Sequence, residues 1–95
     1  MEPDIPLKTS DEVGGIRRSC RLAMEVVKLL GSAIRPGIST RELNALAGEL
    51  ISSRGAEPAL DSNFPGSACL SVNEVAAHGV PSSYRLREGD TIIVD

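Results

Sequence analysis

The hydrophobic periodicity of this chain changes once, and that change limits the folds it can adopt. Between residues 9 and 55, apolar residues recur at helical spacing in two segments, each of which follows a capping-box sequence. From residue 56 onward, turn residues separate short runs of β-branched and other apolar residues, as is typical of strands. Helical segments followed by strands predict an α+β fold, with two helices and then antiparallel strands.

The first predicted helix begins at the capping box Thr9-Ser-Asp-Glu12 and stops at Pro36-Gly37. Its apolar stripe has alternating three- and four-residue spacings. The stripe consists of Val13, Ile16, Cys20, Ala23, Val27, Leu30 and Ile34. Gly14 and Gly15 lie in the first turns, where each glycine costs about 1 kcal/mol relative to alanine. We therefore expect a helix that is frayed at its start.

The second predicted helix has the clearest pattern in the chain. It follows the capping box Ser39-Thr-Arg-Glu42, and Gly55 supplies the left-handed position after its last turn. Arg54 suits the negative end of the helix dipole. The apolar positions match the helical template without a gap and are Leu43, Leu46, Ala47, Leu50 and Ile51.

The second half of the chain contains turns and short strands. Residues 57–66 are rich in turn-forming residues, and residues 69–72 and 91–95 read as strands. Between them, the apolar residues 75–77 lead to His78, the only histidine, and then to a loop. The run Thr-Ile-Ile-Val before Asp95 predicts a buried strand that ends in a carboxylate.

Composition excludes several functional classes. The chain has 95 residues, enough for one small domain or part of a larger one. Its net charge of −3 and its two aromatic residues, Phe64 and Tyr84, argue against nucleic-acid binding, which needs a basic surface or stacking platforms. Cys20 and Cys69 lie too far apart for a zinc knuckle and do not form a disulfide pattern.

The start of the chain lacks the basic segment and apolar run of a signal peptide. No apolar stretch is long enough to cross a bilayer. We therefore expect a soluble cytoplasmic protein that does not bind membranes.

His78 and Asp95 are the main candidates for chemistry, and each has an ordinary alternative. His78 is either a turn or core histidine with satisfied hydrogen bonds, or an imidazole near a reacting amide or a metal-bound water. Asp95 is either a solvated chain end or a hard oxygen ligand of the kind that dinuclear hydrolases use. A single aspartate cannot hold a metal, and no second Asp, Glu or His stands at a paired spacing.

Two further residues have open roles. Cys69 could be a nucleophile, but no acid–base pattern stands near it, which favours a small buried residue or a pocket wall. Phe64 could line a pocket or fill the core.

Two stretches carry a family resemblance. Residues 71–81, S-V-N-E-V-A-A-H-G-V-P, are similar to the S-x-N-E-x-x-x-H-G-x-P stretch of type I methionine aminopeptidases. Residues 86–95, L-R-E-G-D-T-I-I-V-D, resemble the L-x-x-G-D-x-h-x-h-D stretch of the same family, where h is apolar. The start Lys8-Thr9, the connection R-P-G-I-S-T at 35–40 and Phe64-Pro65 also fit, so the resemblance runs from about residue 5 to the end.

The resemblance implies a fold and an activity. That family has the pita-bread fold, two pseudo-symmetric halves of helices and antiparallel strands around a dinuclear metal site. It removes the initiator methionine from nascent polypeptides, near the ribosome, with two divalent metal ions (Co, Mn, Fe, Zn or Ni). The metals polarise the scissile carbonyl and activate the attacking water.

The resemblance also implies residue roles. Asp95 is the first metal-ligand aspartate, and His78 hydrogen-bonds the substrate near the scissile amide. Phe64 and Cys69 line the pocket for the methionine side chain. Pro58 and Asp61 stand where the family often has other pocket residues, so the shape of the pocket is less constrained.

The rest of the family's metal site has no counterpart within these residues. A second aspartate, a histidine and two glutamates lie downstream in the family. Residues 1–95 are therefore expected to be the N-terminal part of one catalytic domain, inactive alone and requiring a C-terminal half. The alternatives are a peptidase for X-Pro bonds and a non-catalytic pita-bread relative.

Overall fold

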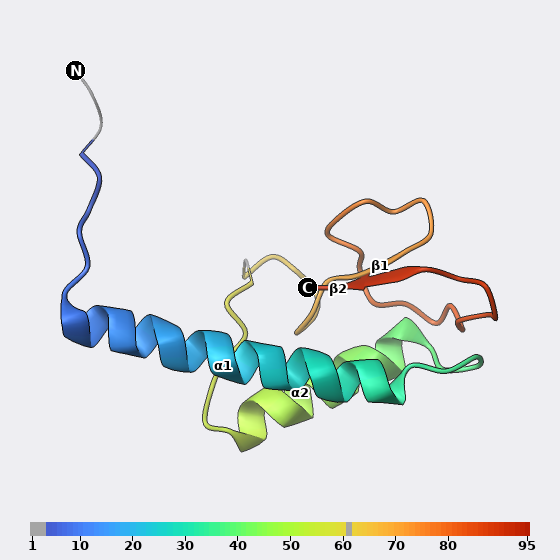
Figure 1. Cartoon of the computed structure of the whole chain (residues 1–95). Helices are drawn as coiled ribbons and strands as arrows, with labels where there is room; N and C mark the ends of the chain where they lie inside the picture. The colour runs from blue at the N-terminus through green and yellow to red at the C-terminus, as the bar shows by residue number, and fades with distance from the viewer. Residues whose placement is uncertain (1–3, 61) are drawn as a thin grey trace.

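A computed structural model describes residues 4–60 and 62–95, which form two helices and a small sheet (Figure 1). The elements follow in the order α1 (Ser10–Ala33), α2 (Thr40–Ser53), β1 (Leu70–Val72) and β2 (Ile92–Val94). The two strands are antiparallel, with Leu70 opposite Val94. The predicted α+β arrangement, two helices followed by antiparallel strands, is confirmed.

Helix α1 begins at the predicted capping box. The Thr9 hydroxyl accepts a hydrogen bond from the Glu12 amide at 3.1 Å, and the Glu12 carboxylate accepts one from the Thr9 amide at 2.9 Å. These bonds also lower the pKa of Glu12. The helix is regular from Ser10 through Gly14 and Gly15, so the expectation of a frayed start is wrong. The reciprocal cap satisfies donors that would otherwise favour opening of the first turn.

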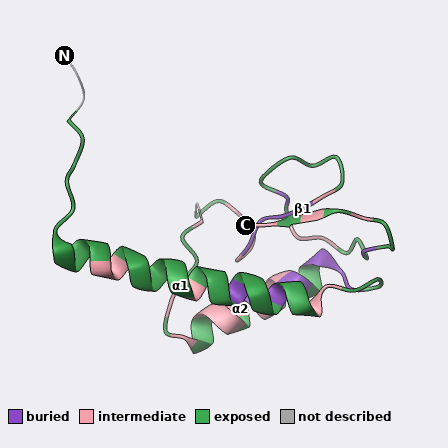
Figure 2. Ribbon diagram, in the orientation of Figure 1, coloured by how far each residue is buried: buried purple, intermediate pink, exposed green. Residues whose placement is uncertain are grey.

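The apolar stripe of α1 is covered only toward its C-terminal end. Figure 2 shows buried residues of α1 only in the second half of the helix. Leu30 is 1% exposed and Val26 is buried one turn before it, whereas Ile16 is 50% exposed. Val13 and Val27 are also exposed. Among the described residues, the core cluster draws its α1 members only from the second half of the helix.

Within the predicted stripe, only Leu30 and Ile34 belong to the core or pack against it, whereas Cys20, Ala23 and Val27 are exposed. Leu22, Val26 and Ala33, which lie beside the predicted stripe, pack in the core region instead. The predicted stripe is therefore wrong at most of its positions.

Helix α2 departs from its predicted cap in one detail. The Ser39 hydroxyl accepts from the Glu42 amide at 3.0 Å, as expected. The Glu42 carboxylate, however, pairs with the Arg85 guanidinium at 3.3 Å instead of returning to the Ser39 amide. All five predicted apolar positions of α2 belong to the core or pack against it.

The end of α2 follows the sequence pattern. Gly55 has φ +69°, and its amide and that of Ala56 close the last turn on Ser52 and Ile51. The Arg54 side chain donates to the Leu50 carbonyl at 3.1 Å and forms an ion pair with Glu25 at 2.7 Å, which joins the end of α2 to α1.

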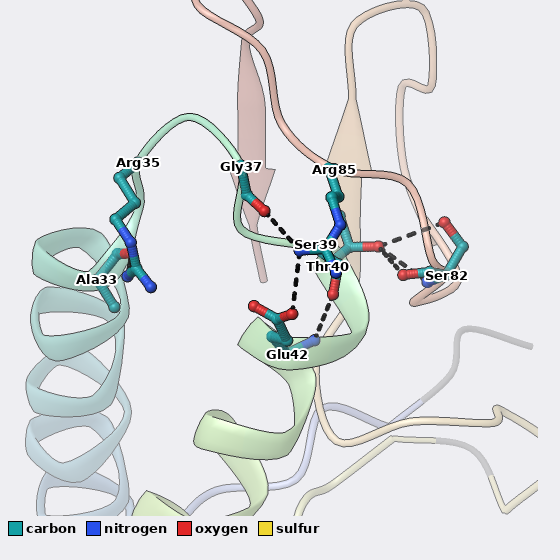
Figure 3. A network of polar contacts seen from close by, with 8 residues as sticks. All are labelled: Ala33, Arg35, Gly37, Ser39, Thr40, Glu42, Ser82 and Arg85. Carbon is teal, nitrogen blue, oxygen red and sulfur yellow. Dashed lines mark hydrogen bonds and ion pairs between the residues drawn. The ribbon is translucent and has the colours of Figure 1, made fainter.

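The connection between the helices is held by a segment from the far end of the chain (Figure 3). The Gly37 amide donates to the Leu86 carbonyl at 2.7 Å, and the Ser82 amide donates to the Thr40 hydroxyl at 2.8 Å. The Arg85 side chain also donates to the Gly37 carbonyl at 2.8 Å. Residues 82–86 therefore lie against the start of α2.

One apolar core joins these elements. Its fully buried members come from both helices, from β1 and from the connecting segments, and are Val26, Leu30, Ile38, Leu43, Ala47, Ala68, Leu70 and Leu86. No helix among the described residues carries an apolar run long enough to cross a membrane.

A carboxylate clasp closes the connection between β1 and β2. Asp90 accepts hydrogen bonds from the Arg87 amide at 2.8 Å, the Tyr84 hydroxyl at 2.7 Å and the Asn73 side-chain amide at 3.0 Å. Asn73, at φ +54°, in turn accepts from the Thr91 amide at 3.0 Å. These bonds, the one from the Arg87 amide above all, lower the pKa of Asp90. The bond to Asp90 raises the pKa of Tyr84.

We expect Asp90→Asn to destabilise the protein at neutral pH and to reduce its sensitivity to acid. Folding lowers the pKa of Asp90, so its contribution is present above the unfolded-state pKa, near 4, and is lost as the pH falls through the folded-state pKa. Urea unfolding of the wild type and the variant between neutral pH and about pH 3 measures this. The difference between the two proteins should shrink below about pH 4.

Glu88→Gln is the matched control, because Glu88 is an exposed carboxylate in the same turn. It should leave the pH dependence of the free energy of unfolding unchanged. A constant difference between wild type and Asp90→Asn across this range would contradict the role given to the clasp.

Candidate active site

Strand β1 holds both main candidate residues, one through each of its edges. On one edge, Cys69, directly before β1, pairs with Asp95. The Cys69 amide donates to the Asp95 backbone oxygen at 2.7 Å, and the Asp95 amide donates to the Cys69 carbonyl at 3.0 Å. On the other edge, the Leu70 amide donates to the Gly79 carbonyl at 3.0 Å. Alternate residues of a strand direct their backbone groups to opposite edges, so β1 can bind β2 and the His78 loop at once.

The backbone at His78 is irregular and fixed. His78 has φ +55°, a left-handed conformation that few residues with a side chain adopt. Gly79 is buried against β1, and a Cβ there would overlap the Leu70 carbonyl oxygen. The imidazole itself is exposed. The backbone is therefore held while the side chain remains available to a ligand.

His78 lines a cavity of about 420 Å³ between the loop after β1 and the segment before β2. Glu74 and Tyr84 line the same cavity, together with the apolar residues Val75 and Val80. An imidazole, a carboxylate and a phenol around one opening can exchange hydrogen bonds with a polar ligand.

The proposed methionine-pocket residues are not among those that line this cavity. Cys69 is a buried free thiol, 2% exposed, and the Phe64 ring is half-buried against Gly66. A buried sulfur has little access to a substrate carbonyl, which agrees with a wall or core residue more than a nucleophile. Pro58 is exposed, and Asp61 lies outside the described residues.

The strand that leads to Asp95 is less buried than its sequence predicts. Ile92 and Val94 are partly buried, and Ile93 is 55% exposed. The prediction of a buried strand is therefore wrong for these residues. Within the described residues, β2 pairs only with β1, and one of its two faces stays open.

The residues present fit a metal site only in part. Asp95 is an exposed carboxylate, a hard oxygen donor of the kind that divalent cations prefer. In the described parts of the chain, no group of three or more His, Cys, Asp and Glu side chains is placed to hold an ion. These residues therefore do not enclose a metal by themselves.

Sequence reasoning missed three residues that hold the site together. Ser71 and Asn73 lie in the first motif stretch and Asp90 lies in the second, but the motifs alone gave them no role. In the structure, Ser71 bonds the Gly79 amide at 3.0 Å, and Asn73 and Asp90 form the clasp. The sequence did carry a signal for such a role: all three are short polar residues next to turn-forming residues, and such side chains often hydrogen-bond the backbone of a turn.

Comparison with known proteins agrees with this arrangement. The model of metallopeptidase family M24 matches residues 14–95. Methionine aminopeptidase of Clostridium perfringens is 40% identical over 93 residues, which cover 96% of this chain and 37% of that protein. Methionine aminopeptidase 1 of Saccharomyces cerevisiae is 42% identical, over 97% of this chain and 24% of its own length.

The fold is also similar to that of solved enzymes. The crystal structure of methionine aminopeptidase from Rickettsia prowazekii superposes with a TM-score of 0.93 at 32% identity, covering 97% of this chain and 38% of that one. The chain thus spans between about a quarter and two fifths of the length of these relatives, as part of a pita-bread domain. Because the family model covers most of α1, all of α2 and both strands, the chain belongs to metallopeptidase family M24.

Proposed function

We propose that this chain is the N-terminal part of a methionine aminopeptidase, which removes the initiator methionine from nascent polypeptides. The observation that carries the proposal is the double use of β1, which holds the His78 loop on one edge and Asp95 on the other. The two motif stretches are separated in sequence by residues 82–85, and β1 binds a part of each of them. The names of the relatives support the substrate.

In this proposal, His78 binds the substrate and not the metal. Its exposed imidazole stands on a fixed left-handed backbone at the mouth of a cavity, where it can hydrogen-bond a peptide near the scissile amide. Phe64 and Cys69 would contribute apolar walls for the methionine side chain. The partners would be the N-termini of new polypeptides, close to the ribosome in the cytoplasm.

Asp95 would be one ligand of two divalent metal ions, with Co, Mn, Fe, Zn and Ni as candidates. Its carboxylate chemistry suits that role, but the remaining ligands must come from a C-terminal half beyond these residues. Among the alternatives, a peptidase for X-Pro bonds is disfavoured, because the relatives matched here are named methionine aminopeptidases.

The proposal can be tested in a hybrid protein, in which residues 1–95 replace the matching part of the Clostridium perfringens enzyme. We expect His78→Asn in this hybrid to keep the metal content and to lose turnover by about 10²–10⁴-fold, the range of an orienting or acid–base group. Asparagine tolerates the left-handed backbone, so the variant removes the imidazole with little strain. Steady-state cleavage of a Met-Ala-Ser peptide and metal analysis give the two readouts. Loss of bound metal would show that His78 is a ligand instead.

We expect the hybrid to prefer an apolar first residue and a small second one. Peptides that start with methionine should be cleaved far faster than peptides that start with lysine, because burial of an unpaired charge is costly. Phe64→Ala should narrow this difference in rate, because Phe64 is one of the proposed walls of the methionine pocket. Similar rates on methionyl and lysyl peptides would contradict the assignment.

We expect residues 1–95 alone to have no aminopeptidase activity and no tight metal binding. A single exposed carboxylate at the end of β2 cannot enclose two hard cations. Calorimetric titration with Mn²⁺ or Co²⁺ and a peptide-cleavage assay of the isolated chain measure this. Binding of two metal ions at micromolar affinity, or turnover, would show that the chain contains a complete site.

A further inference from the structure

Ser71 is a buried polar residue that the proposed chemistry does not use. It is 3% exposed and lies in the middle of β1, where its backbone pairs with Ile93 of β2. Its hydroxyl accepts a hydrogen bond from the Gly79 amide at 3.0 Å, a contact that is buried and spans eight residues of sequence. Gly79 directly follows His78.

The peptide units around Gly79 are held at both ends. The amide is bound by the Ser71 side chain, and the carbonyl accepts from the Leu70 amide at 3.0 Å. Between these two bonds the Gly79 Cα approaches β1 so closely that only glycine fits. Two bonds and one steric contact therefore fix the chain direction immediately after His78.

This restraint matters because of the conformation at His78. A non-glycine residue at φ +55° is disfavoured by about 1 kcal/mol or more and persists only when its surroundings impose it. The amide that Ser71 binds belongs to the peptide bond between His78 and Gly79. The Ser71 hydroxyl thus holds one of the two peptide planes that set where the imidazole stands.

We propose that Ser71 is a positioning residue for His78: its hydroxyl fixes the His78–Gly79 peptide and thereby aims the imidazole into the cavity. Without the hydroxyl, the Gly79 amide would be a buried donor with no acceptor, and the loop would relax away from β1. This inference rests on the proposed function for its effect on catalysis, but the contact itself lies wholly within the chain.

Amide hydrogen exchange of the 95-residue chain tests the contact directly. We expect the Gly79 amide to exchange about tenfold faster in Ser71→Ala than in the wild type, since loss of one buried partner shifts local opening by about that factor. Ser71→Thr keeps a hydroxyl and should restore slow exchange. Ser83→Ala, at an exposed serine in the following loop, should change nothing at Gly79. Equal rates in wild type and Ser71→Ala would overturn the proposal.

A double-mutant cycle in the hybrid protein tests the catalytic consequence. Ser71→Ala should lower kcat about five- to tenfold with unchanged metal content, and should have no further effect when His78 is already asparagine. A rate loss of the same size in both backgrounds would indicate a general structural role and overturn the proposal. If the unsubstituted hybrid is inactive, the proposed function fails, and the exchange rates alone decide whether Ser71 holds the loop.

Discussion

The structure depends on a three-residue strand that uses both of its edges. The backbone groups of Ser71, and of Cys69 and Asn73 on either side of the strand, point toward β2 and the residues that flank it. The Leu70 amide points to the opposite edge and binds the Gly79 carbonyl. A two-stranded ribbon is marginal in water by itself. Here the third partner is a loop, and the side chain of Leu70 is buried in the core beneath. Strand β1 is therefore stabilised by β2, by the His78 loop and by the core, although only two strands are present among the described residues.

The polar residues of the motif stretches act mainly on the backbone. Ser71 binds one amide of the His78 loop, Asn73 binds the Thr91 amide, and Asp90 collects an amide, a phenol and a carboxamide. These side chains bind backbone amides in turns, where no neighbouring strand supplies a hydrogen-bond partner. The turns therefore keep a single geometry. The placement of the His78 loop and of the strand before Asp95 therefore depends on these side chains.

The uncovered surfaces are consistent with a chain that forms part of a larger domain. The first half of α1 carries an exposed apolar stripe, and one face of β2 is open. In the relatives, the matched region is 24% to 38% of the whole. The same physical rule that buries Leu30 between the helices would favour burial of Ile16 and Ile93 against further protein.

The sequence by itself determined the two helices, their caps, the left-handed glycine after α2 and the α+β order, because these depend on interactions between residues three to five positions apart. It also singled out His78 and Asp95 as the residues to examine. Only the tertiary structure decided how much of each apolar pattern is buried, as Ile16 and Ile93 show. It also decided that Glu42 pairs with Arg85, 43 residues away, and that Ser71 meets Gly79. Such contacts depend on which distant segments the fold brings together, and a local pattern carries no information about that distance.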